Sequence, residues 1–572
     1  RESSDGDPGA ALEKADDVVR GYYGIHTITH CCLESHGSYC EWKGDNLDVH
    51  LSTQNVSGTP GQFAGAPEIA IPVDQVTVEC QYIGGGFGSK FAADEWGIAA
   101  AVLAKEAGKP VRLMLDRATE LKVAGNRPSA FADVQIAADE DGKISLWESH
   151  HWGSKGFKGG TVSPTVMPYV ITPKNRRVRA TGITTHQGGD RAWRAPNHPQ
   201  ACALTSTAID DLAAELEEDP YKVFMDNLDL TQRPNVYAEE MKIAAELMGL
   251  QEKWKGRGKW KDGAIAHGLG MAIHTWGGRA GNAKARIVIN PDGAVETFAG
   301  TQDLGTGTRT IIAQVVAESF GIPLTDVKVN IGSSKFPVSG PSGGSTTIGG
   351  VSGAHRRQCL KALGKLFDLV AAKHSVPAAE LSAAGGNIKQ GDKVVCSWKD
   401  ACRLIGPMKL EVETEDAKPV DDGLTNQGVG GVQMAQVEVD TETGVTRMVK
   451  YVAVQDMGTV INTKLAESQI LGAMIQCISY ALSEERIVDD LTGRFLNANL
   501  REYKLPRIGD IGELVVHIYQ PDSEYSRGVV GLGEPPVISG GAAISNAVAN
   551  AIGKRVPVLP LTPKRVLDTL RT

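Results

Sequence analysis

Four glycine-rich segments constrain this chain more than any other feature of its sequence. They span residues 84–90 (GGGFGSK), 300–308 (GTQDLGTGT), 342–350 (SGGSTTIGG) and 531–536 (GLGEPP). The first follows an apolar stretch, and a loop that follows a strand in this way presents backbone N–H groups that bind anions or oxo groups. It lacks the Gly-Lys-Ser/Thr ending of a nucleotide-binding P-loop. Each segment alone could be an ordinary turn, but together the four indicate one large polar ligand held by backbone from several loops.

Three strand–turn–strand patterns predict antiparallel hairpins. β-Branched residues flank an Asp-Gly or Thr-Gly turn at residues 132–147, 285–298 and 436–454, with a weaker example around Asp45. Apolar residues at helical spacing predict helices at residues 95–107, 205–217, 312–320, 351–370 and 465–482. The mixture predicts an α+β fold. Because 572 residues are too many for one hydrophobic core, we expect at least two domains, with a boundary in the pattern-poor stretch at residues 253–262.

The composition argues against several classes of protein. No apolar run approaches the roughly 18 residues that a membrane-spanning helix needs. A net charge of −9, spread along the chain, argues against a nucleic-acid partner, because phosphate binding needs a basic surface. The nine cysteines include no Cys-x-x-Cys pair. We therefore expect neither a disulfide framework nor an ordinary iron–sulfur or zinc-ribbon motif.

A group of His and Cys residues near the N-terminus looks like a metal cluster. It contains His30, Cys31, Cys32, His36 and Cys40. The spacing is not a standard zinc one, and adjacent cysteines cannot both easily face one tetrahedral ion. We therefore do not expect these residues to bind zinc.

The glycine-rich segments occur in a recognisable order with other motifs. Residues 84–90, 191–196 (RAWRAP), 302–308, 342–350 and 533–536 follow one another as in the large subunit of molybdenum hydroxylases. Residues 30–34 with 52–54, 219–220 and 456–462 add to the match, which runs from about residue 15 to the C-terminus. The chain therefore resembles the molybdenum-cofactor-binding subunit of the xanthine oxidase and aldehyde oxidoreductase family. The resemblance implies two large mixed α/β domains, residues 1–262 and 263–572, with the cofactor between them.

The resemblance also implies roles for individual residues. Glu534 would be the catalytic base that takes a proton at the molybdenum centre. Gln54 would contact the oxo side of the metal, and Arg194 would hold the molybdenum end of the cofactor. The metal would be held through the pterin, with no direct protein ligand. The other residues expected to contact the cofactor are Gly86, Phe87, Gly88, Ala192, Trp193, Gly305, Thr306, Gly307, Ser345, Thr346, Thr347, Gln476 and Gly533.

Three positions predict which substrates fit. Purine-oxidising members of the family carry a Glu directly after the Lys that closes the first glycine-rich motif, and Phe91 stands there instead. Pro196 and Trp276 lie near the positions of the two rings that stack on the substrate in those members. An apolar slot of this kind suits flat rings, so we expect hydroxylation of an aldehyde or N-heteroaromatic carbon with oxygen derived from water. The alternatives are a xanthine or purine dehydrogenase subunit and a catalytically silent scaffold of the same fold.

The family resemblance implies further cofactors and partners. We expect a molybdenum–pterin dinucleotide, in the molybdopterin cytosine dinucleotide form usual in bacterial relatives. Electrons would pass to an iron–sulfur subunit with 2Fe-2S centres and to a FAD or haem (cytochrome) subunit. The family's small N-terminal domain lies before the matched region, so we expect either a separate chain that supplies it or its absence. We expect a cytoplasmic protein, or a periplasmic one exported through a partner's signal.

Overall fold

The computed structural model describes residues 1–418 and 428–572 and contains every predicted hairpin. The hairpin expected at residues 132–147 is β9 (Ala130–Ala138) with β10 (Ile144–Ser154). The others are β14 (Arg286–Ile289) with β15 (Val295–Ala299), β21 (Val429–Asp440) with β22 (Thr446–Asp456), and β4 (Gly37–Lys43) with β5 (Asn46–Leu51). At the turn between β9 and β10, Gly142 has a φ of +72°, a conformation that glycine adopts without strain.

Two of these hairpins lie in two large mixed sheets. One sheet has six strands in the order β1-β11-β10-β9-β2-β24, and the other has five in the order β12-β13-β21-β22-β23. In the first, β2 pairs in parallel with β24, so residues from near both ends of the chain meet in one sheet. The remaining strands are β1 (Glu2–Asp5), β2 (Asp17–Ile25), β11 (Asn175–Ile183), β24 (Val558–Leu559), β12 (Lys261–Asp262), β13 (Ile265–Trp276) and β23 (Glu513–Tyr519).

One hydrophobic core joins the two large sheets through two helices. Helix α5 (His198–Glu215) packs against β2 and β9, α14 (Gly540–Ile552) packs against β13 and β21, and the two helices contact each other. Every residue of α14 is buried. This helix lies so close to β13 that a Cβ on Gly268 would be 2.0 Å from the carbonyl oxygen of Ala547. Glycine at this position therefore allows backbone to pack on backbone.

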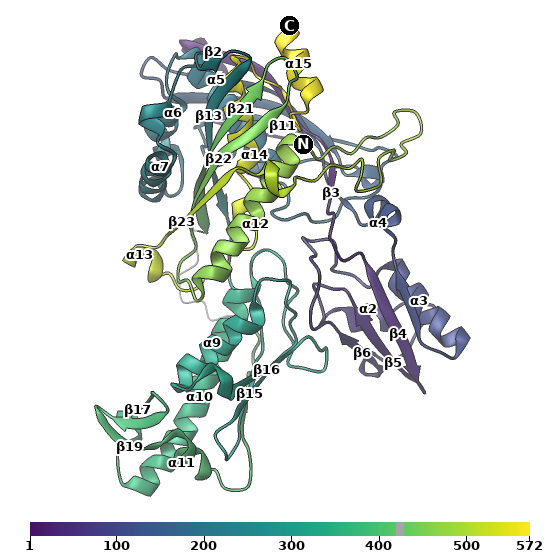
Figure 1. Ribbon diagram of the computed structural model, residues 1–572, viewed down its shortest axis with the longest axis vertical. Coiled ribbons are helices and arrows are strands. Elements are labelled where there is room, and N and C mark those ends of the chain that lie inside the picture. The colour runs from purple at the N-terminus through teal and green to yellow at the C-terminus, as the bar shows by residue number, and fades with distance from the viewer. Residues whose placement is uncertain (419–427) are drawn as a thin grey trace.

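Two smaller units, each with a core of its own, lie below the large sheets in Figure 1. One holds the sheet β6-β5-β4-β7 with α2 and α3, and the other holds the sheets β16-β15-β14-β20 and β17-β18-β19 with α9, α10 and α11. Their further elements are β6 (Val76–Glu79), β7 (Val111–Met114), α2 (Thr59–Ala64), α3 (Asp94–Ala107), β16 (Val327–Ile331), β20 (Leu410–Glu413), β17 (Leu381–Ala384), β18 (Asn387–Gln390), β19 (Lys393–Ser397), α9 (Thr308–Phe320), α10 (Thr347–His374) and α11 (Trp398–Arg403).

The five predicted helices are present as α3, α5, α9, α10 and α12 (Thr463–Leu482). Helix α5 begins at His198, seven residues before the predicted start at 205, with Pro199 in its first turn, where proline fits a helix. Two long helices were not predicted, α14 and α7 (Pro234–Met248). The other elements are α1 (Pro8–Glu13), α4 (Arg117–Val123), α6 (Pro220–Asp226), α8 (Leu250–Lys253), α13 (Asp522–Tyr525), α15 (Pro563–Arg571), β3 (Ile28–Thr29) and β8 (Asn126–Arg127).

The predicted α+β class is confirmed. The main core contains residues from both sides of position 262, such as Ile136 and Val452, and the division into two domains there stays a prediction. Among the helices in residues 1–418 and 428–572, none combines the length and the apolar character that crossing a bilayer requires.

Candidate active site

A cavity of about 700 Å³ brings together all four glycine-rich segments. Most of the predicted site residues lie in its wall: Gln54, Gly86, Phe87, Gly88, Phe91, Ala192, Arg194, Pro196, Trp276, Thr306, Ser345, Thr346, Thr347, Gly533 and Glu534. Four do not, namely Trp193, Gly305, Gly307 and Gln476. Segments more than 400 residues apart in the sequence therefore converge on one cavity, as expected for a single large ligand.

Trp193 and Gln476 support the wall from behind. The indole Nε1 of Trp193 donates to the carbonyl oxygen of Thr29 at 3.1 Å, and its ring lies 3.7 Å from the guanidinium carbon of the buried Arg127. The side-chain oxygen of Gln476 accepts a hydrogen bond from Arg194 at 2.9 Å. Both residues hold the segment that carries Arg194, and neither lines the cavity.

The side chain of Gln54 links two of the glycine-rich segments. Its Oε1 accepts from the N–H of Gly88 at 2.8 Å, and its Nε2 donates to the carbonyl oxygen of Ser342 at 2.8 Å. A Cβ on Gly86 would lie 2.4 Å from Oε1, so this approach requires glycine. Both ends of the amide are thus bonded to backbone, and a contact between Gln54 and the oxo side of the metal stays a prediction.

Arg194 ties three segments of the wall together. Its Nε donates to the carbonyl oxygen of Gly533 at 2.6 Å, and its two terminal nitrogens donate to Gln476 at 2.9 Å and to the carbonyl oxygen of Gln469 at 3.0 Å. Burial lowers the pKa of the guanidinium to about 10. Arg194 therefore remains a cation at neutral pH and adds positive charge to the wall.

Glu534 holds its carboxyl group in the cavity wall by two contacts. Oε1 accepts from the N–H of Ala195 at 3.0 Å, and Oε2 accepts from the hydroxyl of Ser345 at 3.2 Å. Burial raises the pKa of this carboxyl above its usual value, and the two donors and the Arg194 guanidinium oppose the rise. A carboxylate with raised proton affinity, fixed in a cavity, is suited to act as a general base.

Three helices begin at the cavity. The residues that line it include Thr306 before α9, Thr347 at the start of α10 and Asn462 before α12. Helix N-termini attract anions, because their free N–H groups and dipoles favour negative charge. Thr346, the residue before α10, makes no side-chain cap to its helix.

The second glycine-rich segment, residues 300–308, folds around the side chain of Asp303. The carboxylate of Asp303 accepts from the N–H groups of Gly305 at 2.9 Å, Gly307 at 3.1 Å and Arg309 at 3.2 Å. The amides of both glycines are therefore used inside the loop, and Leu304 and Thr306 are the residues of this segment that line the cavity. The sequence pattern did not indicate this role of Asp303, because an Asp at such a position is also typical of an ordinary turn.

Apolar side chains form much of the remaining wall. The structure brings together Phe91, Pro196 and Trp276, as predicted, and the indole Nε1 of Trp276 donates to the carbonyl oxygen of Gly344 at 3.1 Å. The sequence reasoning missed further apolar members, namely Leu304, Ile311, Met457, Val460, Leu465, Val529 and Val530. They come from loops and helix starts, where no periodic pattern marks a buried face.

Four residues with a strained backbone conformation lie in the cavity wall or in segments that form it. Phe87, Ala195, Asn197 and Ser345 have φ angles of 50°, 62°, 71° and 61°, in the left-handed region that side chains other than glycine rarely adopt. Such residues persist only where the surroundings fix them, and they cluster at functional sites. The observation supports this cavity as the functional site.

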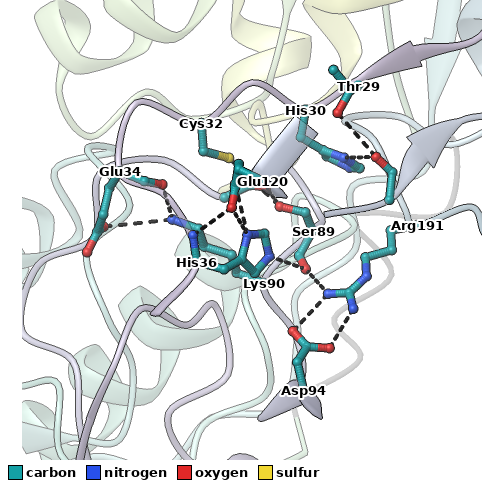
Figure 2. Close-up of polar contacts among 12 residues, drawn as sticks. Thr29, His30, Cys32, Glu34, His36, Ser89, Lys90, Asp94, Glu120 and Arg191 are labelled. Carbon is teal, nitrogen blue, oxygen red and sulfur yellow. Dashed lines mark hydrogen bonds and ion pairs between the residues drawn. The ribbon is translucent and has the colours of Figure 1, made fainter. Parts of the chain in front are cut away.

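A polar cluster holds the first glycine-rich loop from outside the cavity (Figure 2). The ammonium of the fully buried Lys90 donates to the carbonyl oxygen of Glu34 at 2.7 Å. His36 contacts Glu120 at 2.9 Å and the carbonyl oxygen of Ser89 at 3.0 Å. Arg191 donates to the same oxygen at 2.6 Å and pairs with Asp94.

The His and Cys residues near the N-terminus contact backbone. His30 contacts the carbonyl oxygens of Ala192 at 2.6 Å and Gly125 at 3.2 Å. Burial raises the pKa of Cys32 to about 11, so this thiol stays protonated at neutral pH. In the part of the chain that the structure describes, no three His, Cys, Asp or Glu residues are placed to hold a metal ion.

The residues of this cavity fit a molybdenum–pterin cofactor. Glycine backbone approaches other backbone so closely that a Cβ on Gly88 would lie 2.2 Å from the carbonyl oxygen of Ala192, and one on Gly531 would lie 1.5 Å from that of Ser345. The starts of α10 and α12 offer N–H groups to phosphates, whereas the N–H groups of Gly307 and Arg309 at α9 are bonded to Asp303, and Arg194 adds a cation. These are the features of a site for a large, polar, anionic group.

Comparison with known proteins agrees with this geometry. Two models described as molybdopterin cofactor-binding domains match residues 1–228 and 243–512. The chain is 30% identical to the aldehyde oxidoreductase molybdenum-binding subunit PaoC of Escherichia coli O157:H7, over 99% of this chain and 77% of that protein. It is 27% identical to the putative xanthine dehydrogenase molybdenum-binding subunit XdhA of Escherichia coli strain K12, over 99% and 78%. The crystal structure of quinoline 2-oxidoreductase from Pseudomonas putida 86 has the same fold, with a TM-score of 0.89, 21% identity and coverage of 100% of this chain and 78% of that one.

Fold and cavity thus define a molybdopterin-binding protein. More particularly, the chain belongs to the family of molybdenum-binding subunits of aldehyde oxidoreductases and xanthine dehydrogenases, which are molybdenum-dependent hydroxylases and dehydrogenases. The family predicted from the order of the glycine-rich motifs is confirmed.

Proposed function

We propose that this chain is the catalytic subunit of an enzyme that hydroxylates an aldehyde or N-heteroaromatic carbon with oxygen derived from water. The observation that carries the proposal is the carboxyl of Glu534, held by Ala195 and Ser345 in the wall of a largely apolar cavity. A catalytically silent scaffold would have no use for a positioned carboxyl group beside a cofactor site.

The cofactor that we propose is the cytosine form of the molybdenum–pterin dinucleotide. The starts of α10 and α12, with the hydroxyls of Thr306, Thr346 and Thr347, would hold its phosphates. Glycine backbone at Gly86 and Gly533 would lie against the pterin, and Arg194 would hold the metal end. When bound, the group supplies a two-electron oxidant and activates water.

Glu534 would take the proton of the water from which the new oxygen comes. A base works best when its pKa lies near the working pH. Burial moves the pKa of Glu534 upward from its usual value, and thus toward neutral pH. The contacts from Ala195 and Ser345 keep the ionised carboxylate available and fix its direction.

The apolar wall of the cavity favours the binding of flat, uncharged substrates. Phe91 offers a ring where a purine would need a hydrogen-bonding carboxylate, and its edge lies beside Gly343, where a Cβ would be 2.7 Å from the ring. The ring of Trp276 is fixed by its bond to Gly344 and by the edge of His198, with ring centres 4.6 Å apart. The similar proteins include an aldehyde oxidoreductase and a quinoline oxidoreductase, and their names support the same substrate class. Electrons would leave to iron–sulfur and flavin or cytochrome partners.

Metal analysis and a substrate panel test this function. We expect about one molybdenum per chain in purified protein, and kcat/KM values for benzaldehyde and quinoline that exceed the value for xanthine. An active preparation without molybdenum would refute the cofactor. Molybdenum without turnover of any of the three substrates would favour the silent scaffold, and a highest kcat/KM for xanthine would favour the purine alternative.

A further inference from the structure

We propose that Ser345 is a positioning residue for Glu534, whose hydroxyl orients the carboxyl group and favours its ionised, proton-accepting form. The inference rests on the proposed function, since it takes Glu534 as the base. It adds to the cofactor-contacting role that the family resemblance implies for Ser345.

The hydroxyl of Ser345 contacts Glu534 at two points. It accepts a hydrogen bond from the backbone N–H of Glu534 at 2.8 Å and donates one to Oε2 at 3.2 Å. Because one group contacts both the backbone and the carboxyl of the same residue, it restricts the side-chain torsions between them. With the Ala195 N–H on Oε1, each carboxyl oxygen has one protein donor. Donors stabilise the charged form of a carboxyl group.

The backbone around Ser345 places this hydroxyl. Ser345 has a φ of 61°, and its carbonyl oxygen lies so close to Gly531 that a Cβ there would be 1.5 Å away. The third and fourth glycine-rich segments therefore pack backbone against backbone at this point. The next hydroxyl, that of Thr346, donates instead to the carbonyl oxygen of Gly343 at 2.9 Å. The contact with Glu534 is thus specific to Ser345 among these neighbours.

The groups around Glu534 indicate how the Ser345 hydroxyl affects the pKa of the Glu534 carboxyl. Burial raises the pKa of the carboxyl, and four groups oppose the rise: the Ala195 N–H, the hydroxyl and the backbone N–H of Ser345, and the Arg194 guanidinium. Within residues 1–418 and 428–572, Arg194 is the charged group that acts on this carboxyl, and its own donors are bonded to Gly533, Gln476 and Gln469. Removing the Ser345 hydroxyl should therefore raise the pKa of Glu534 further.

The test compares two hydroxyl deletions with a matched control. Ser345→Ala removes the hydroxyl, and Ser345→Gly removes it while relaxing the left-handed backbone, so a folding defect of one variant does not end the test. Ser352→Ala is the control, because this buried hydroxyl on α10 donates to the carbonyl oxygen of Gly349. The first measurement is the pH dependence of kcat/KM for benzaldehyde. The second is an infrared pH titration of the carboxyl band in the cofactor-free chain, with Glu534→Gln spectra subtracted.

We expect both Ser345 variants to move the acid limb of the kcat/KM profile upward by about one to two pH units, because a hydrogen bond to a charged group has about that effect on a pKa. The midpoint of the infrared titration should move upward by the same amount. Ser352→Ala should leave both where they are. Unshifted midpoints in folded Ser345 variants would overturn the inference. If the midpoints are unshifted and Glu534→Gln is inactive, the result refutes the role of Ser345 and leaves the proposed function standing. An active Glu534→Gln would instead refute the proposed function, and the role of Ser345 with it.

Discussion

Replacing Gly88 with alanine tests whether the first glycine-rich loop has room for anything but glycine. Gly88 has a φ of +105°, and a Cβ on it would lie 2.2 Å from the carbonyl oxygen and 2.6 Å from the carbonyl carbon of Ala192. Both atoms belong to the backbone, so they cannot swing away as a side chain would. Relief requires the loop to move, and that movement would break the bond from the Gly88 N–H to Gln54.

The expected loss follows from these contacts. A strained backbone conformation costs about 1–3 kcal/mol, and the lost hydrogen bond adds about 1 kcal/mol. A total of about 3 kcal/mol corresponds to a cofactor affinity lower by roughly two orders of magnitude, if the loop must return to its place for the cofactor to bind. Molybdenum per chain and the cofactor dissociation constant measure the effect.

Gly142→Ala is the matched control for Gly88→Ala. Gly142 also has a positive φ of +72°, but no neighbouring atom lies within 4 Å of the position of its Cβ. The Gly142→Ala substitution should lower the free energy of unfolding by about 1–2 kcal/mol and leave the cofactor content unchanged. If Gly88→Ala retained as much molybdenum as Gly142→Ala, with the same affinity, the close approach of the loop to Ala192 would not matter for binding, and the reasoning would be refuted.

Three further substitutions have definite expected outcomes. Glu534→Gln should keep the cofactor and lower kcat by about 10²–10⁴-fold, because a general base contributes that much; near-normal kcat at full molybdenum content would contradict the assignment. Phe91→Glu should raise kcat/KM for xanthine relative to benzaldehyde, since a carboxylate can hydrogen-bond a purine; an unchanged ratio in steady-state kinetics would show that this position does not select the substrate. Arg194→Lys should lower the cofactor content roughly tenfold or more, because lysine cannot reach Gly533, Gln476 and Gln469 together; full cofactor content by metal analysis would argue against this link.

The sequence predicted the parts of the fold that have local causes. The turn at Gly142 and the alternation around it predicted β9 and β10, and the apolar spacing before Gly108 predicted α3. Helix α14 was not predicted, because it is buried on all sides and has no polar face that would produce a periodic pattern. The cavity's position was predicted through motif order, which reflects shared ancestry and is not itself a physical signal.

What the sequence could not supply was the pairing of groups across the site. Ser345 was expected to contact the cofactor, and nothing in the sequence indicates that its hydroxyl lies between the backbone and the carboxyl of Glu534, 189 residues away. The amide of Gln54 was expected at the metal and is bonded to Gly88 and Ser342. Such contacts depend on how distant loops meet, which local pattern does not encode.

The pairing of β2 with β24 affects the order in which this protein can mature on the ribosome. Gly24 and Ile25 of β2 lie opposite Val558 and Leu559. At ribosomal speeds of about 5–20 residues per second, the interval between the two strands is roughly half a minute to two minutes. During that time one edge of β2 lacks its partner, and unpaired strand edges promote aggregation. Glu534 and α14 also emerge late, so a nascent chain cannot complete its cofactor cavity, and cofactor insertion must wait until translation of this region is finished.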